Sequence, residues 1–371
     1  MNTKLARDLG LEFPIFAFTH CRDVAAGVSK AGGMGVFGVA AHSASGLRVE
    51  LEWIEKEIGD KPYGVDLLLP TRFVGSDKAG GLGLDELDAK IPEEHRRFLN
   101  DLLEQHSVPE LPDDVQLGDG FAVGYERQKD VIEILFEHNI SLIASALGPP
   151  PSWMIDMSRE KGVQVAALAG TVEHARRHVE AGVDIVVAQG YEAGGHTGQV
   201  ATMVLVPEVV DAVGDIPVLA AGGIGSGRQI TASLALGAQG VWIGSLWLTT
   251  EEAETHPVVK EKFLKATSSD TIRSRSLTGK PARQLRSAWT DAWDDPSNPD
   301  PLPMPLQPRL IREAQARISR TAHKSAGAAQ LSNYFVGQIV GSMNHTKSVR
   351  TVMEELAIEY ADTMERLDEW A

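Results

Sequence analysis

A glycine-rich loop with one histidine is the first place in this chain where side chains could carry chemistry. The stretch VVAQGYEAGGHTG, residues 186–198, runs from an apolar segment into a loop that holds Glu192 and His196. Histidine has an unperturbed pKa of about 6.5, so it can act as a base at neutral pH, and an acidic surrounding would raise that value. A lone histidine is more often a packing or surface residue, so the function of His196 depends on its placement.

Two further glycine-rich turns follow consecutive apolar segments. In IPVLAAGGIGSGRQ, an apolar run leads into Gly222 and Gly223, and the next run, GVWIG, ends at Gly244 and is followed by Ser245. Glycine lets an anion approach the backbone closely, and backbone N–H groups at helix N-termini bind phosphate. One such turn alone would be interpreted as a tight turn and nothing else, but two in succession predict a bound phosphate.

The elements that precede these loops must position them. Along the chain, predicted strands alternate with predicted helices. Short apolar segments are each followed by a longer segment with helical spacing. Helices that end at a capping glycine before a buried strand recur in SKAGGMGVFGV, VEAGVDIVVAQ and LALGAQGVWIG. Eight continuous apolar strands predict a TIM (β/α)8 barrel, with an open doubly wound sheet as the alternative. The predicted strands begin at Pro14, Gly35, Tyr63, Ser141, Val163, Asp184, Pro217 and Gly240.

In that barrel, His196 would follow strand six and the two glycine turns would follow strands seven and eight, at the C-terminal mouth where catalytic groups sit. Two segments do not fit the eight units. Residues 75–120 form an insertion after strand three, which is either a solvated loop or a lid. Residues 267–371 form a helical extension that we expect to pack on the barrel. The barrel domain is therefore expected to span residues 1–266, with the insertion inside it.

The composition excludes several classes of function. Of 371 residues, 35 are Lys or Arg and 51 are Asp or Glu, so the formal net charge is -16. This charge repels nucleic acid and anionic membranes, so we expect neither as a partner. Cys21 is the only cysteine, so we expect no metal site, no internal disulfide and a reducing, cytoplasmic location. The N-terminus lacks the apolar core and cleavage site of a signal peptide.

The two glycine-rich motifs together resemble a known family. QGYEAGGHTG, followed by AAGGIGSGRQITASLALGAQGVWIGS, is similar to the nitronate monooxygenase family, formerly called 2-nitropropane dioxygenases, and to its relatives the FMN-dependent enoyl-ACP reductases. The resemblance covers residues 10–70 and 120–290 and extends more faintly to VGQIVGSMN. It includes the segment RSRSLTGKPARQLRSAWTDAW, for which we expect a packing role. It implies a TIM barrel that binds FMN, with His196 as the catalytic histidine. It also implies that the cofactor is bound by Ala17, Phe18, Asp66, Gln189, Gly190, Gly194, Gly195, Gly222, Gly223, Gly244 and Ser245.

The front of the barrel departs from the family pattern at two places. Where the family usually has a segment like APMAG after strand one, this chain reads AFTHC, which puts Thr19 and His20 in the expected substrate pocket. Where strand three usually carries GVN, this chain has GVD, so Asp66 replaces an asparagine that would meet the pyrimidine edge of the flavin. A negative charge on Asp66 would disfavour the anionic reduced flavin. Cys21, beside this mouth, is interpreted as a small buried residue.

Three functions are compatible with these residues, because a fold and a cofactor do not fix the reaction. The favoured one is an FMN-dependent nitronate monooxygenase that oxidises nitronates or nitroalkanes with O2 to carbonyl compounds and nitrite. The alternative is an NAD(P)H-dependent FMN reductase of an enoyl thioester or a quinone, in which His196 donates or positions a proton. The third is a phosphate-binding barrel without turnover. All three imply a small-molecule ligand, and all are compatible with a homo-oligomer.

Overall fold

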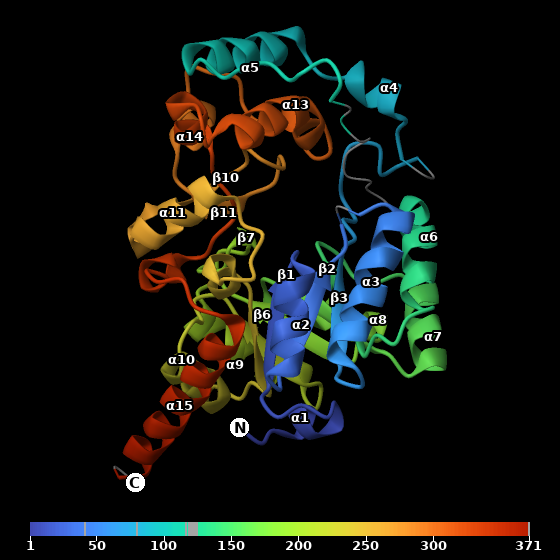
Figure 1. Ribbon diagram of the computed structural model, residues 1–371. Coiled ribbons are helices and arrows are strands. Elements are labelled where there is room, and N and C mark those ends of the chain that lie inside the picture. The colour runs from blue at the N-terminus through green and yellow to red at the C-terminus, as the bar shows by residue number, and fades with distance from the viewer. Residues whose placement is uncertain (41, 79–80, 116, 118–124, 370–371) are drawn as a thin grey trace.

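The computed structural model describes residues 1–40, 42–78, 81–115, 117 and 125–369, and its centre is a closed barrel of parallel strands (Figure 1). Each barrel strand pairs with the next, and β1 also pairs with β9, so the sheet closes on itself. This closure confirms the predicted TIM barrel and excludes the open sheet. The barrel strands are β1 (Ile15–Thr19), β2 (Met34–Gly38), β3 (Tyr63–Leu68), β4 (Leu142–Ala146), β5 (Gln164–Ala169), β6 (Ile185–Gln189), β8 (Val218–Ala221) and β9 (Gly240–Ile243).

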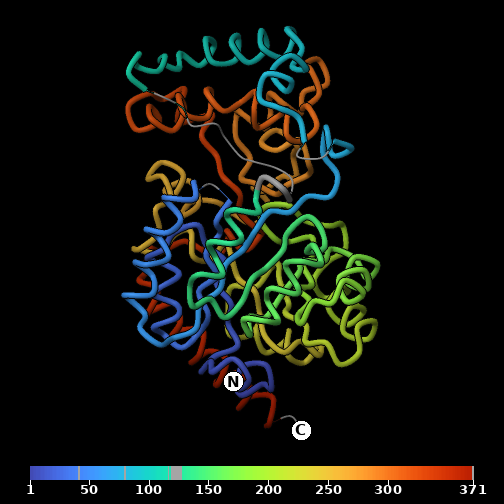
Figure 2. Tube along the Cα trace, turned by 90° about the vertical axis from the view of Figure 1, so that its right-hand side faces the viewer, coloured from blue at the N-terminus to red at the C-terminus, as the bar shows by residue number. Residues whose placement is uncertain are grey.

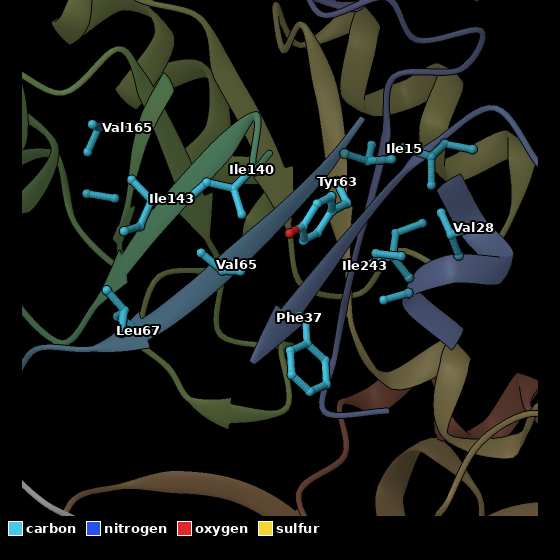
Figure 3. Close-up of a cluster of buried hydrophobic side chains, with 14 of the residues drawn as sticks. Ile15, Val28, Phe37, Tyr63, Val65, Leu67, Ile140, Ile143, Val165 and Ile243 are labelled. Carbon is cyan, nitrogen blue, oxygen red and sulfur yellow. The ribbon is translucent and has the colours of Figure 1, made fainter. Parts of the chain in front are cut away.

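Side chains alternate along each barrel strand between two apolar layers. On β1, Phe16 belongs to the cluster inside the barrel, whereas Ile15 and Ala17 belong to the cluster between the strands and the helices. Figure 3 shows part of this outer cluster, in which Ile15 and Val28 of α2 (Arg22–Lys30) both take part. Because both faces of the sheet are covered, the strands read as continuous apolar runs in the sequence.

The helices around the barrel come from both ends of the chain. The last helix packs against α10 and α2 (Figure 1). A Cβ on Gly227 would lie 2.2 Å from the backbone nitrogen of Tyr360, so this close approach requires glycine. The carboxylate of Glu359 accepts a hydrogen bond from the Gly227 N–H at 2.7 Å. Helix α1 (Lys4–Asp8) contributes Leu5 and Ala6 to the cluster inside the barrel. The helices around the strands, besides α2, are α3 (Ala44–Ile58), α6 (Tyr125–Leu135), α7 (Ser152–Lys161), α8 (Val172–Ala181), α9 (Thr202–Val213), α10 (Gly227–Ala235) and the last helix, α15 (Val349–Asp368).

A second apolar core stands above the mouth of the barrel, and we call the described residues 82–108 and 288–331 around it the cap (Figure 1, Figure 2). Leu102 from the insertion and Trp293 from the C-terminal part belong to this core. Arg309 donates through Nε to Asp88 at 2.8 Å, which ties the two parts together. The cap helices are α4 (Leu84–Asp88), α5 (Glu93–Gln105), α12 (Ala288–Asp294), α13 (Leu306–Thr321) and α14 (Ala326–Leu331).

The division into two domains at residue 266 stays a prediction, and the apolar clusters show which of these segments pack together. The insertion and the helices α12 to α14 share one core, whereas α15 returns to the barrel. The reason is that the amphipathic helices of the insertion find their apolar partners in the C-terminal part of the chain. Residues 79–80, 116 and 118–120 of the predicted insertion lie outside the described residues.

A small antiparallel sheet connects the cap with the loop that carries His196. It consists of β10 (Thr271–Ser274), β11 (Ala282–Leu285) and β7 (Gly195–His196), in the order β10, β11, β7. No described helix is both long and apolar enough to cross a membrane. The remaining short elements are η1 (Ser245–Thr249), α11 (Pro257–Lys265), η2 (Ser268–Asp270) and η3 (Gln338–Ser342).

Candidate active site

A cavity of about 1260 Å³ lies between the C-terminal ends of the barrel strands and the cap. All the predicted site residues except Ala17 and Gly190 line it, and the cap contributes Ile318 of α13. In parallel barrels this is the active-site face, because every strand ends at the same mouth. None of the described residues from 75 to 115 lines the cavity. Helix α5 packs on α13, so the described part of the insertion supports the cavity wall from behind.

Ala17 and Gly190 are not among the residues that line the cavity, and their contact with a cofactor stays a prediction. Ala17 is buried against the helices, because its neighbours on β1 take the inward positions and side chains alternate along a strand. Gly190 is enclosed by helix α9, where a Cβ would lie 2.0 Å from the hydroxyl of Thr202. Its carbonyl accepts a hydrogen bond from the Thr197 hydroxyl at 2.7 Å. Gly190 therefore shapes the loop.

The two glycine turns form a set of free backbone donors at one side of the cavity. Gly222 and Gly223 have φ of +96° and +72°, values that side-chain-bearing residues rarely adopt. The backbone N–H groups of Gly222, Gly223, Gly244 and Ser245 donate to no acceptor in the described part of the chain. Neighbouring N–H groups without partners at the ends of adjacent strands suit a phosphate.

His196 lies in β7 at the cavity wall, half-buried, and pairs with Ala282 of β11. Its Nδ1 is 3.4 Å from the carbonyl oxygen of Pro281. A carbonyl can only accept, so this contact favours the tautomer with the proton on Nδ1 and the lone pair on Nε2. Burial lowers the pKa of His196 to about 4, against the opposing effect of the Pro281 hydrogen bond, and the positive charge of Lys280 lowers it further. An acidic surrounding, which would have raised the pKa, is absent among these contacts.

Two arginines of the β10–β11 hairpin hold this loop, and sequence reasoning missed both. Arg283, which is only 2% exposed, donates to the carbonyl oxygen of Tyr191 from two nitrogens, at 3.1 and 3.0 Å. Its guanidinium also lies 4.3 Å from the centre of the Tyr191 ring. Arg273 donates to the carbonyl oxygen of Thr197 at 3.0 Å. The segment RSRSLTGKPARQLRSAWTDAW resembles the family, but nothing in its residue types indicated these contacts.

The segment 332–339 closes the same loop from another side and was also missed. Gln338 donates its backbone N–H to the carbonyl of Glu192 at 2.9 Å, and Gly337 donates to the hydroxyl of Ser245 at 2.8 Å. The Glu192 carboxylate accepts from the Thr202 N–H and hydroxyl, both at 2.9 Å, so this glutamate is a loop anchor. The weak resemblance of VGQIVGSMN was the one signal that pointed to this segment.

Asp66 points into the upper barrel from β3 and lines the cavity. It is only 4% exposed, and its Oδ2 has no hydrogen-bond partner among the residues that the structure describes. Burial raises the pKa of Asp66 well above its usual value, because water no longer solvates the charged form. Burial therefore disfavours the negative charge that the sequence led us to consider for Asp66.

The front wall of the cavity contains Thr19, His20 and Cys21. The Nδ1 of His20 is 3.1 Å from the carbonyl oxygen of Gly38, and burial lowers the pKa of His20, so the ring is neutral at pH 7. Cys21 donates through Sγ to the carbonyl of Glu252 at 3.1 Å, and burial raises the pKa of this thiol. A protonated, buried thiol is unreactive, which agrees with the packing role assigned to Cys21.

Comparison with known proteins agrees with this geometry. The family model "Nitronate monooxygenase" matches residues 13–359. The "Putative monooxygenase Rv1533" of Mycobacterium tuberculosis is 56% identical over 370 residues, which cover 99% of this chain and 98% of that protein.

Two solved structures share the fold over nearly the whole chain. Nitroalkane oxidase from Streptomyces ansochromogenes is 27% identical with a TM-score of 0.79, covering 97% of this chain and 99% of its own. FabK from Thermotoga maritima is 27% identical with a TM-score of 0.73, with full coverage of both chains. The fold, the family-model match and a relative of this similarity lead to one conclusion: the chain belongs to the nitronate monooxygenase family, a family of flavin-dependent oxidoreductases.

Proposed function

We propose that this chain is an FMN-dependent nitronate monooxygenase that converts nitronates or nitroalkanes, with O2, to carbonyl compounds and nitrite. The family of the chain and its likeness to nitroalkane oxidase support this reaction class. FMN, when bound, would supply the electron transfer that links oxidation of the nitro compound to O2. The lone buried thiol of Cys21 supports a cytoplasmic location, where cysteines stay reduced.

The residues at the cavity fit FMN. The free N–H groups of Gly222, Gly223, Gly244 and Ser245 provide donors for its single phosphate. The buried Asp66 offers an unpaired polar group to the far side of the ligand. The sequence has no second glycine fingerprint followed by a ribose-binding acid, which favours FMN over a dinucleotide flavin.

The observation that carries the proposal is a neutral imidazole beside an unpaired cation. His196 has a pKa of about 4, so above that pH its Nε2 is free to accept a proton from the carbon next to a nitro group. The ammonium of Lys280 lines the same cavity and has no ion pair in the described chain. Its positive charge would attract a nitronate, which is an anion, and stabilise the negative charge that forms when a nitroalkane loses its proton.

The second candidate is the NAD(P)H-dependent FMN reductase of an enoyl thioester or quinone. The likeness to FabK favours it, and so does the cavity of about 1260 Å³, because pockets for one ligand usually measure about 300–1000 Å³. With a pKa of about 4, His196 is rarely protonated at neutral pH, so in that reaction it would position a proton more readily than donate one.

Anaerobic mixing experiments with the protein as purified separate these functions. Separate runs with a nitronate, NADH and NADPH are followed by the absorbance of oxidised flavin. Bleaching by the nitronate alone is the expected result. Rapid bleaching by a reduced nicotinamide and none by the nitronate would assign the reductase, and a protein that carries no flavin would be a phosphate-binding barrel without turnover.

A further inference from the structure

Thr202 lies directly behind the glycine turn that follows β8. It is the first residue of α9 and is 8% exposed, and its Oγ1 lies 2.9 Å from the carbonyl oxygen of Gly222 and 3.3 Å from that of Ala221. A Cβ on Gly222 would lie only 3.1 Å from this oxygen, so the close approach favours glycine. Thr202 is not among the residues that line the cavity, so it can affect a bound ligand only through the turn.

The hydroxyl of Thr202 contacts a peptide group that could otherwise take more than one orientation. The carbonyl of Gly222 and the N–H of Gly223 belong to one planar trans peptide, so they point in opposite directions. Because both flanking residues are glycines, with φ of +96° and +72°, sterics alone do not fix how this peptide is turned. A hydroxyl that donates to the carbonyl from the side of α9 turns the N–H of Gly223 away from α9. This N–H has no acceptor in the described part of the chain.

The neighbouring N–H, that of Gly222, is held in a similar way by a backbone contact. The N–H of Gly190 donates to the carbonyl oxygen of Ala221 at 2.9 Å. The N–H of Gly222 shares a peptide with that carbonyl, so it points away from Gly190. Of these two contacts, the one that Thr202 makes comes from a side chain, so a substitution can remove it.

We propose that Thr202 positions the phosphate site of the flavin: its hydroxyl holds the peptide between Gly222 and Gly223 so that the N–H of Gly223 is directed at the phosphate. The inference rests on the proposed FMN site. It adds a residue outside the cavity that makes the site prefer a flavin with a phosphate over one without it. Thr202 itself touches neither the flavin nor the substrate, so it is a positioning residue.

The hydroxyl of Thr202 has one proton and two acceptors at the same distance. Its Oγ1 is also 2.9 Å from Oε2 of Glu192, which already accepts the backbone N–H of Thr202 at 2.9 Å. The proton is therefore shared between Glu192 and the carbonyl of Gly222. A phosphate that accepts the N–H of Gly223 polarises the peptide, and hydrogen bonds in such a chain strengthen one another. Binding of the phosphate then draws the shared proton towards Gly222.

Titration of the flavin-free protein with FMN and with riboflavin tests this role, because riboflavin has the same ring and ribityl chain but no phosphate. Thr202→Val keeps the shape of the side chain and removes the hydroxyl, whereas the matched control Thr202→Ser keeps the hydroxyl. The affinity of Thr202→Val for FMN, measured by quenching of flavin fluorescence, should fall about tenfold, because a buried carbonyl loses its donor. Its affinity for riboflavin should stay at the wild-type value. Thr202→Ser should match the wild type with both flavins.

Two further measurements keep the test independent of one variant. Thr202→Ala also lacks the hydroxyl and should lose FMN affinity as Thr202→Val does. The phosphorus resonance of bound FMN should shift in Thr202→Val and keep its wild-type position in Thr202→Ser. A resonance that does not move in Thr202→Val would contradict the inference.

The pattern across the two flavins separates the possible outcomes. Unchanged FMN affinity without the hydroxyl would overturn the inference. An equal loss of affinity for FMN and riboflavin would also overturn it, because the effect would then lie in the fold and not in the phosphate site. If the wild type binds both flavins equally, the phosphate site and this inference fail while a flavin-dependent reaction stands. If the wild type binds neither flavin, the proposed function fails as well.

Discussion

The guanidinium of Arg283 holds the carbonyl oxygen of Tyr191 through two nitrogens, although the two residues are 92 positions apart in the chain. The contact fixes the start of the loop that ends at His196, and β11 pairs with β7 immediately beside it. A buried pair of charge-assisted hydrogen bonds stabilises the fold more than a neutral pair does. Its loss destabilises the fold further, because it leaves a buried carbonyl oxygen without a donor. The loop that carries His196 therefore depends on a hairpin that lies outside the barrel.

Arg283→Met should loosen this loop without removing the flavin. We expect the free energy of unfolding to fall by about 1–3 kcal/mol, because the Tyr191 carbonyl loses its partners in a buried place, and kcat to fall with it. The matched control is Arg286→Met, since Arg286 is exposed and pairs only with Asp291 at the surface. Calorimetry, flavin content and turnover are measured for both. Equal behaviour of the two variants would contradict the assigned role of Arg283.

Gly244→Asp should abolish flavin binding by charge repulsion at the phosphate turns. Gly244 has a negative φ of -115°, and a Cβ there would only reach ordinary contact with Phe18, at 3.6 Å, so the backbone accepts a side chain. Gly244→Asn has nearly the same shape without the charge. The flavin-to-protein ratio after purification should be much lower for Asp than for Asn. Equal retention by both variants would place the phosphate elsewhere.

His196→Asn should separate proton abstraction from flavin binding. A positioned base contributes about 10²- to 10⁴-fold, so activity on a neutral nitroalkane should fall by that factor. Activity on a pre-formed nitronate should fall far less, because its proton is already gone. Flavin content should not change, since the phosphate turns come from other loops. An equal loss on both substrates would remove the role of His196 as the base.

The pH profile should follow the lowered pKa of His196. Because the imidazole is active only when neutral, kcat/KM for a neutral nitroalkane should be flat above about pH 5 and fall as the pH drops through about 4. Lys280→Gln should move the acidic limb of this profile, the fall of kcat/KM at low pH, to higher pH. The reason is that the substitution removes a nearby positive charge that disfavours the imidazolium. Lys265→Gln, at an exposed lysine of α11, is the control. A limb that stays in place in Lys280→Gln would contradict the coupling.

Asp66→Asn should stabilise the flavin-free protein at neutral pH. In the unfolded chain Asp66 ionises at its usual pKa of about 3.9, whereas in the folded protein burial raises its pKa, so the proton is lost only at higher pH. The folded state then binds one more proton, so stability falls as pH rises between the two pKa values, by up to about 1.4 kcal/mol per pH unit. The melting temperature of Asp66→Asn should exceed that of the wild type at pH 7, and the difference should shrink towards pH 4. A difference independent of pH would mean that Asp66 is ionised.

The sequence by itself determined the barrel and the loops at its mouth. Each strand is a local apolar run next to a glycine-capped helix, and the turns at Gly222 and Gly244 are read from neighbouring residues. The placement of His196 followed from the same alternation of strands and helices, because every loop that follows a barrel strand lies at the C-terminal mouth. The alternation of inward and outward side chains along β1 also indicates that Ala17 faces the helices. The family resemblance nevertheless led us to expect a cofactor contact at Ala17.

Only the tertiary structure decided what surrounds these residues. The contacts of Arg283 with Tyr191 and of Gly337 with Ser245 join segments that are 92 residues apart in each case, and no local pattern encodes such a pairing. The pKa values of His196 and Asp66 depend on how much water the folded chain excludes, and this exclusion sums over atoms from many distant segments. For that reason the sequence supplied the titratable groups, and the fold shifted their pKa values.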